Sequence, residues 1–355
     1  MLRRVQEPGG GEPAARRALV ATSVAVGVVA LALALWKLKL VVALVFVGTT
    51  FAAAMRPGVE ALARRRVPRS VGVLLHYAVL AGLVALFLSF VVPRLVTEVQ
   101  AAIDAAHSHP GVHGVKGRLL DALQRRLNEL PHAEGLWRAA LTAGEEAVKV
   151  LVGVLFTLAT AAYWVFERDR FVDFVTSFVP RPKRKKVRDT WELVDLKLGA
   201  FVRGQLLLVT LVATVVSTAF FLVGEPYWLL LGIAVALLEI LPVVGPLAAL
   251  VLAVGAGMTE SWRTAALAGG ALLLIRVVQD YVVNPRVLGG VVGLSPLLVL
   301  VAVSAVGVVL GPFYVLVAVP LSSLLVTVMQ VVVMGVEPAE EEVPTVLLPA
   351  KETET

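Results

Sequence analysis

Residues 226–259 read PYWLLLGIAVALLEILPVVGPLAALVLAVGAGMT, and this stretch decides the fold. It is apolar almost throughout, and Glu239 is its only Asp, Glu, Lys or Arg. An ionised side chain at the centre of a bilayer costs roughly 2.5–3.5 kcal/mol on insertion scales unless protein or water receives it. Directly after it, Pro242, Gly245 and Pro246 favour a break in the helix. A charge beside a broken helix in an apolar run is typical of a transport site in a membrane.

The composition of the whole chain supports a membrane protein. Of the 355 residues, 58% are hydrophobic, against about 45–50% in soluble domains. The net charge is +6, but the basic residues flank apolar runs. We therefore interpret them as topology signals and not as a nucleic-acid surface. The chain has no cysteine, which excludes disulfides, thiol catalysis and Cys-based metal sites.

Apolar runs long enough to cross a bilayer recur along the chain. The last of them, residues 287–336, has no Asp, Glu, Lys or Arg, yet as one helix it would be about 75 Å long against a hydrocarbon core of about 30 Å. It must break, and Gly311 and Pro312 lie at one suitable point. We predict an all-α polytopic protein with about eight spans, the later ones broken or re-entrant. The runs are residues 18–36, 40–55, 71–92, 150–166, 204–224, 226–259, 264–285 and 287–336.

The distribution of Lys and Arg predicts the topology. Basic residues are dense in the N-terminal tail (1–17) and in residues 167–203, and sparse between the first two runs. This predicts a multi-pass protein of the cytoplasmic (inner) membrane with a cytoplasmic N-terminus. The membrane domain would cover 18–336, with an extracytoplasmic segment of amphipathic helices at 93–149 and a basic cytoplasmic segment at 167–203. An acidic tail follows at 337–355.

A second polar cluster lies in residues 276–284. Arg276, Asp280 and Asn284 are spaced i, i+4, i+8, so they share one helix face, and Gln279 is beside them. Either Arg276 and Asp280 neutralise each other and help the span to pack, or the stripe lines a substrate or ion path. We favour the path, because ionisable groups inside a membrane are usually functional. Pro285 is expected to end this helix and to free carbonyl groups for coordination.

Glu239 also has two readings. It is either a structural residue that bonds the backbone freed by Pro242, or a site for a proton, a sodium ion or a polar solute, which we favour. The sequence has no Walker A loop and no GxSxG motif, so neither a nucleotide-driven pump nor a nucleophilic hydrolase is indicated. We expect no enzymatic activity, no cofactor and no metal site. The histidines of HSHPGVH (107–113) match no closed zinc pattern.

Several motifs resemble the autoinducer-2 exporter (AI-2E) family of membrane transporters. LLEILPVVGP (237–246) resembles its IPxxGP signature, and QDYVVNPRVLGGVVGLSPLLVLVAV (279–303) resembles its second signature. VLVAVPLSSLL (315–325) resembles its last helix, and AYWVFERDR (162–170) and FVRGQLLLV (201–209) resemble the edges of its cytoplasmic segment. The chain departs from the family pattern at Tyr314, where a glycine is usual, and at Asp280, where asparagine is frequent. The added charge favours cation coupling.

The resemblance implies about eight spans, a cytoplasmic N-terminus, homo-oligomers and transport without ATP. Named members export autoinducer-2, and others are linked to sodium/proton exchange. We therefore expect a secondary transporter that exports a small polar solute, such as an autoinducer-2-like signal, by alternating access coupled to a proton or sodium gradient. The alternatives are a sodium/proton antiporter of the same family, and a non-transporting membrane scaffold or assembly protein. The lipid bilayer is a further expected partner, and we expect no binding of nucleic acid.

Overall fold

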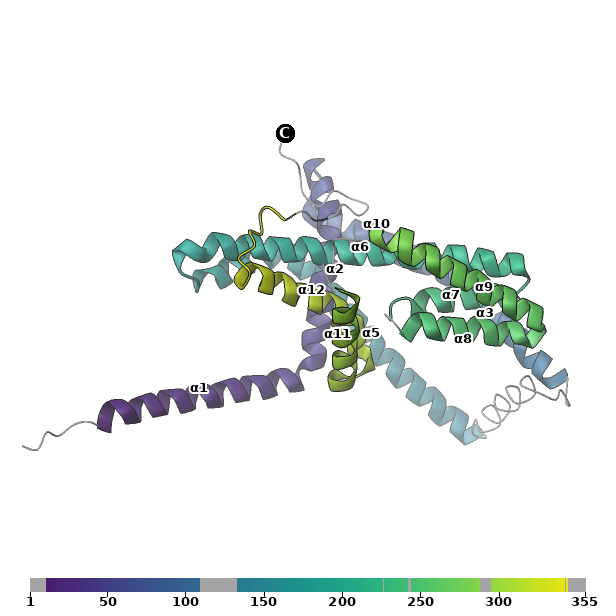
Figure 1. Ribbon diagram of the computed structural model, residues 1–355, viewed down its shortest axis with the longest axis horizontal. Helices are drawn as coiled ribbons and strands as arrows, with labels where there is room; N and C mark the ends of the chain where they lie inside the picture. Colours follow the sequence, from purple (N-terminus) through teal and green to yellow (C-terminus); the bar gives the residue numbers. More distant parts are fainter. Residues whose placement is uncertain are drawn as a thin grey trace, which may run out of the picture.

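The computed structural model describes residues 11–108, 133–225, 227–241, 244–287, 295–341 and 343. Within these ranges every regular element is a helix (Figure 1), as the sequence predicts for an all-α protein. In chain order they are α1 (Gly11–Lys37), α2 (Lys39–Arg64), α3 (Arg69–Ser108), α5 (Ala133–Ser177), η1 (Arg181–Lys183), α6 (Arg184–Val223), α7 (Trp228–Leu238), α8 (Val244–Glu260), α9 (Trp262–Val278), η2 (Gln279–Val283), α10 (Asn284–Val287), α11 (Pro296–Leu310), η3 (Pro312–Tyr314) and α12 (Val315–Val332).

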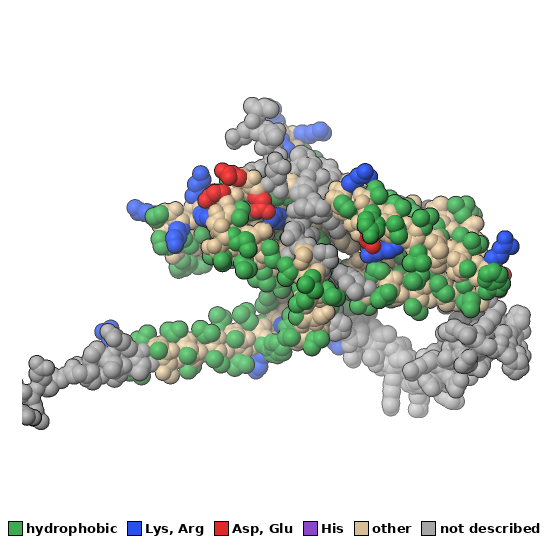
Figure 2. Space-filling model, in the orientation of Figure 1, with side chains coloured by type: hydrophobic (Ala, Val, Ile, Leu, Met, Phe, Trp, Pro, Cys, Tyr) green, Lys and Arg blue, Asp and Glu red, His purple; other side chains and the backbone are tan. Residues whose placement is uncertain are grey.

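The lengths and surfaces of these helices confirm a multi-pass membrane protein. Among the described residues, seven helices are long and apolar enough to cross a bilayer. Hydrophobic side chains cover much of the visible surface of these helices (Figure 2). Leu19, for example, is 69% exposed and Leu74 is 67% exposed. Water-soluble monomers rarely expose apolar patches larger than a few hundred Å². Lipid is the neighbour that such a surface requires.

The stretch from 226 to 259 folds into a helical hairpin. α7 has 11 residues and α8 has 17, which is about 16 Å and about 25 Å of helix, so each is shorter than the hydrocarbon core of about 30 Å. They pack side by side (Figure 1). The charge of Glu260, at the end of α8, acts on Glu225, which precedes α7. Glu225 and Glu260 thus lie at the open end of the hairpin, and Glu239 lies at the closed tip.

Gly245 allows the tip of this hairpin to close. A Cβ atom at this position would lie 1.9 Å from the carbonyl oxygen of Leu238, the last residue of α7. Its N–H donates to the carbonyl of Leu241 at 2.9 Å. Only glycine brings the backbone of α8 so close to the end of α7. Pro246 follows in the first turn of α8, whereas Pro242 lies outside the described residues.

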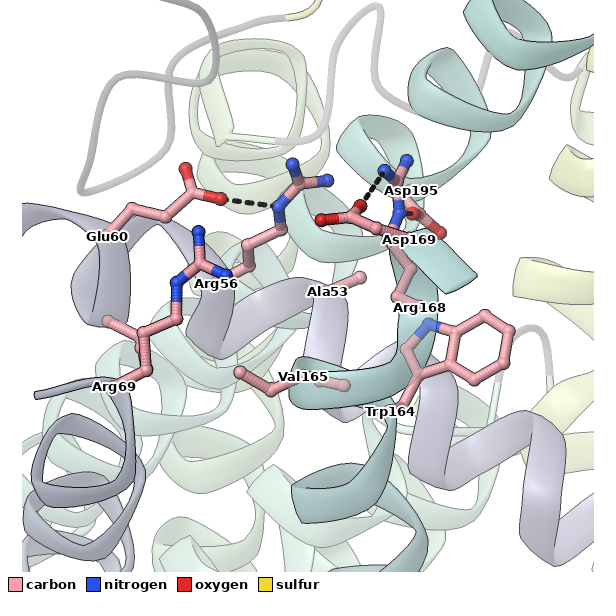
Figure 3. A pocket seen from close by; sticks show the side chains of 11 residues that line it. Ala53, Arg56, Glu60, Arg69, Trp164, Val165, Arg168, Asp169 and Asp195 are labelled. Carbon is pink, nitrogen blue, oxygen red and sulfur yellow. Dashed lines mark hydrogen bonds and ion pairs between the residues drawn. The ribbon is translucent and has the colours of Figure 1, made fainter. Parts of the chain in front are cut away.

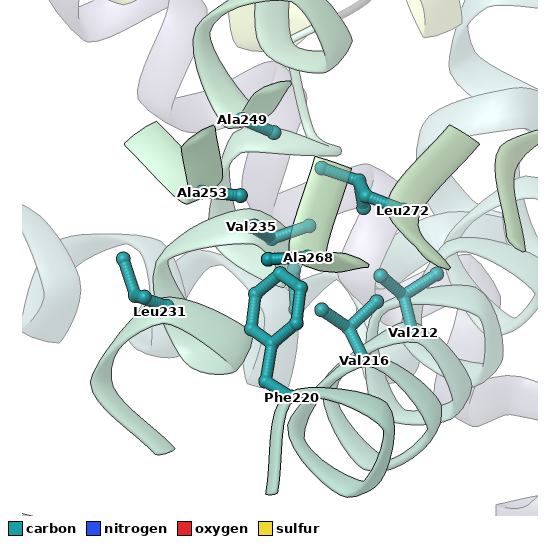
Figure 4. Packing of buried hydrophobic residues seen from close by; sticks show 10 residues of the cluster. Val212, Val216, Phe220, Leu231, Val235, Ala249, Ala253, Ala268 and Leu272 are labelled. Atoms are coloured by element: carbon teal, nitrogen blue, oxygen red, sulfur yellow. The ribbon is translucent and has the colours of Figure 1, made fainter. Parts of the chain in front are cut away.

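The hairpin packs against α6 and α9 through a shared apolar core (Figure 4). Phe220 of α6 is fully buried at its centre. α7 comes close to α6 at Gly232, where a Cβ would lie 2.0 Å from Ser217 Oγ. This packing fixes the hairpin against α6 and α9. The cluster consists of Val212, Val216, Phe220, Leu231, Val235, Ala236, Ala249, Ala253, Ala268 and Leu272.

The last apolar run is broken at Gly311, as its length requires. Gly311 has φ of 110°, and it separates α11 from η3 and α12. The neighbouring Tyr314 is buried against Ala43 of α2. The ammonium of Lys39 lies 5.4 Å from its ring centroid. The tyrosine that departs from the family pattern therefore packs this turn onto α2.

The predicted extracytoplasmic segment is described only at its two ends. α3 continues to Ser108, and α5 begins at Ala133. Both helices are longer than a span needs, with 40 and 45 residues. The histidines at 109 and 113 lie outside the described residues.

Candidate functional site

The five polar residues singled out in the sequence form one hydrogen-bonded network at the hairpin tip. Arg276 Nη1 donates to Glu239 Oε1 at 2.7 Å and to Oε2 at 2.9 Å. Arg276 Nε donates to Asp280 Oδ2 at 2.9 Å. Gln279 Nε2 donates to Glu239 Oε1 at 2.8 Å, and Asn284 Nδ2 donates to Asp280 Oδ1 at 3.1 Å. We call these five residues the tip cluster.

A π-helical turn shapes the second half of the tip cluster. Residues Gln279–Val283 form this turn, and the N–H of Asn284 bonds to the carbonyl of Gln279, five residues back. π-helical turns are rare in proteins, and those that occur are often at functional sites. The helix does not end before Pro285, contrary to the sequence prediction, but continues to Val287. The physical reason is that the widened turn already departs from the i→i−4 pattern that a proline interrupts.

The tip cluster carries one excess negative charge, from two carboxylates and one guanidinium. The Glu239 side chain is 13% exposed, Arg276 29% and Asp280 42%, so the cluster opens on its Asp280 side. Asn284 Oδ1 is buried without a hydrogen-bond partner. An unpaired buried acceptor costs about 1–3 kcal/mol. The arrangement therefore suits a cation or a ligand with N–H or O–H donors.

The other predicted helix-break residues lie apart from this network. Gly311 and Pro312 form the turn beside Tyr314, which packs on α2. Among the described residues, no hydrogen bond or ion pair that we observe joins this turn to the tip cluster.

A second ionic cluster, which the sequence did not single out, lies where α5 and α6 meet near α2 (Figure 3). Arg168 Nε donates to Asp195 Oδ2 at 2.7 Å, and Nη1 donates to Asp169 Oδ1 at 3.1 Å. The Arg168 and Asp195 side chains are only 9% and 12% exposed. Arg56 bonds Glu60 beside them at 2.6 Å. Arg168 and Asp195 lie in charge-rich stretches of the sequence. Nothing in the sequence therefore distinguishes these two buried residues from neighbouring charged residues that face water.

Comparison with known proteins identifies the chain. The model of the AI-2E family transporter matches residues 25–334. A candidate transport protein of Mycobacterium tuberculosis is 28% identical over 323 residues, covering 86% of this chain and 87% of the relative. YrrI of Bacillus subtilis, also named a candidate transport protein, is 22% identical and covers 77% of this chain and 81% of its own length. YueF of the same organism is 24% identical, covering 70% and 74%. With the membrane helices described above, these matches show that the chain belongs to the AI-2E family of membrane transporters.

Proposed function

We propose that this protein is a secondary transporter that exports a small polar solute by alternating access, with the tip cluster as the solute and ion site. The proposal rests chiefly on one observation, the placement of Glu239, Arg276 and Asp280 where α7 ends at the hairpin tip. Broken helices in transporters place backbone and side-chain polar groups at a binding site near the bilayer centre. Transport without ATP agrees with the absence of a Walker A motif from the sequence.

The ion pair between Glu239 and Arg276 suggests how a gradient would be coupled. Each oxygen of Glu239 accepts from the same guanidinium nitrogen. A proton or a sodium ion that binds Glu239 would compete with Arg276 for that carboxylate. Arg276 would then retain Asp280, to which it is already bonded. Exchange of these partners would change the charge at the tip and bias the hairpin toward one of two positions.

Flux in proteoliposomes tests this function. Protein is reconstituted with autoinducer-2 as the probe solute, and efflux is followed under an imposed proton or sodium gradient. We expect Glu239→Gln and Asp280→Asn each to abolish gradient-driven flux at equal amounts of folded protein. Asp173→Asn is the matched control, because it removes a carboxylate from an exposed ion pair with Arg188. Wild-type flux in both tip variants would refute the assignment.

Sodium/proton exchange is a second candidate, favoured by the excess negative charge of the tip cluster and the unpartnered oxygen of Asn284. A proton signal inside the vesicles on addition of sodium, with no organic solute present, would select this alternative. Flux in neither assay would favour the scaffold function.

We also propose a cytoplasmic N-terminus and a cytoplasmic C-terminal tail in the inner membrane. Lys197 of α6 pairs with Glu341, and Lys186 pairs with Glu337 at 3.5 Å. The tail therefore contacts the basic half of α6, which the distribution of Lys and Arg assigns to the cytoplasm. Single cysteines at Ser177 and Glu340, in the cysteine-free chain, should both react only with reagents that reach the cytoplasmic face. Labelling from opposite faces would contradict this topology.

A further inference from the structure

Glu225 is a buried carboxylate that the proposed transport site does not use. It follows Gly224, the left-handed residue that ends α6, and its N–H bonds to the carbonyl of Phe220 at 2.9 Å. The residue is 2% exposed, and neither carboxylate oxygen has a hydrogen-bond partner. Burial of an ionised carboxylate without a partner is so costly that such groups bind a proton instead. The geometry thus indicates a neutral, protonated side chain.

The charged groups around Glu225 strengthen this conclusion. Residues 204–223 of α6 contain no ionisable side chain, and α7 has none before Glu239. Tyr227 precedes α7, α8 contributes Glu260, and Arg263 lies in the first turn of α9. Of these, Glu260 is the group whose charge acts on Glu225. Burial, and then this like charge, raise the pKa of Glu225 to about 7.

Glu225 and Glu260 differ in a way that suits proton exchange. Glu225 is enclosed, whereas Glu260, the last residue of α8, is exposed. A water-facing carboxylate beside a buried one offers a route by which a proton reaches the enclosed group. A metal ion is a poorer fit, because hard divalent cations take six or more oxygen ligands. In the part of the chain that the structure describes, no third acidic or histidine side chain completes a metal site.

We propose that Glu225, with Glu260 as its water-facing partner, forms a proton-binding site at the open end of the α7–α8 hairpin, opposite the tip cluster. With a proton bound, one neutral carboxyl and one carboxylate lie at the base of the hairpin. Loss of that proton leaves two negative charges at the same end of the hairpin. The proton therefore favours the closed base, and its release favours separation of the ends of α7 and α8. This inference stands apart from the transport role assigned to the tip cluster.

Infrared difference spectroscopy of the full-length protein in lipid nanodiscs tests this site directly. The carbonyl stretch of a protonated carboxyl group is followed through a pH titration around neutrality. We expect a band in the wild type that titrates with a midpoint near 7. Glu225→Gln should remove it, and Glu260→Gln should keep it but move the midpoint to lower pH, because a like charge has gone. Glu60→Gln, in a carboxylate paired with Arg56, should leave the band unchanged.

The two variants keep the proposal open to refutation. Glu225→Gln replaces the protonated side chain by a neutral one of the same shape, and Glu260→Gln changes an exposed residue, so both should fold. A band that persists in Glu225→Gln would overturn the site. A midpoint that does not move in Glu260→Gln would overturn the role of its partner. Because the readout is not transport, a failure here is distinguishable from a failure of the tip cluster in the flux assay.

Discussion

Two ionic clusters in this protein use the same chemistry in different helix contexts. Arg168 and Asp195 join α5 and α6, two continuous helices of 45 and 40 residues, and their side chains are 9% and 12% exposed. Arg276 lies in α9, which continues into the π turn, and it pairs with Glu239 at the end of α7, a helix of only 11 residues. Their side chains are 29% and 13% exposed. The first pair fastens long helices together, whereas the second lies at the tip of a short hairpin. An ion pair that is able to exchange partners needs an element that is able to move.

The largest effect on stability is expected from breaking the buried ion pair between Arg168 and Asp195. Asp195→Ala leaves the buried guanidinium of Arg168 without its main partner, and alanine costs the helix nothing. Loss of one partner of a buried pair costs about 3–5 kcal/mol. Thermal unfolding in detergent should show a markedly lower Tm, with transport per folded molecule retained. The double variant Arg168→Met, Asp195→Leu should recover most of the loss, because it removes both charges. An unchanged Tm in Asp195→Ala would show that this ion pair does not stabilise the packing of α5 against α6.

The second largest effect is expected at the hairpin tip. Gly245→Ala places a Cβ 1.9 Å from the Leu238 carbonyl oxygen, so the backbone of the tip must shift. Overpacking of this kind costs about 1–3 kcal/mol. The same variant should lose transport, because the shift separates Glu239 from Arg276. Gly255→Ala is the control in the same helix, since its Cβ would meet nothing within 4 Å; it should stabilise α8 by about 0.5–1 kcal/mol. Equal behaviour of the two glycines would contradict the tight tip.

The third effect concerns pH and the open end of the hairpin. The pKa of Glu225 is raised from its ordinary 4.5 to about 7, so the folded state holds a proton that the unfolded state has released in this interval. Stability should therefore fall as pH rises from 4.5 to about 7, and this contribution should level off above that. Unfolding measured across pH should show a weaker decline in Glu225→Gln than in the wild type. An identical pH dependence in both proteins would contradict the buried proton.

The members of the tip cluster could be singled out from the sequence because charges are rare in the runs that contain them. Glu239 is isolated in 34 residues, and Arg276, Asp280 and Asn284 share a helix face by spacing alone. Sequence could not show that the two groups meet, because that depends on the hairpin fold and on the packing of α9. The π turn was also not predictable, since Pro285 indicated a helix end and not a widened turn before it.

Neither the buried ion pair of Arg168 nor the buried Glu225 could be predicted from the sequence. Arg168 lies in ERDR, where neighbouring charges are solvated, and only the crossing of α5 with α6 buries it. Glu225 lies at the edge of an apolar run, where a carboxylate is usually hydrated. In both cases tertiary packing, and not local pattern, decides the environment of the charge.

The smallest effect on stability is expected at Asp280, and this variant best separates the two kinds of cluster. In Asp280→Asn, Arg276 keeps both bonds to Glu239, and Asp280 is already 42% exposed. The cost should be at most about 0.5 kcal/mol, as for other exposed i,i+4 pairs. Transport should nevertheless fall sharply. When an ion neutralises Glu239, Arg276 needs the Asp280 carboxylate as its remaining partner, and the variant lacks that carboxylate. Asp173→Asn should match it in unfolding and leave transport intact. Asp280→Asn could instead lower Tm as much as Asp195→Ala does, while its folded fraction transports normally. In that case the tip cluster has a structural role, like the Arg168–Asp195 pair, and is not a transport site.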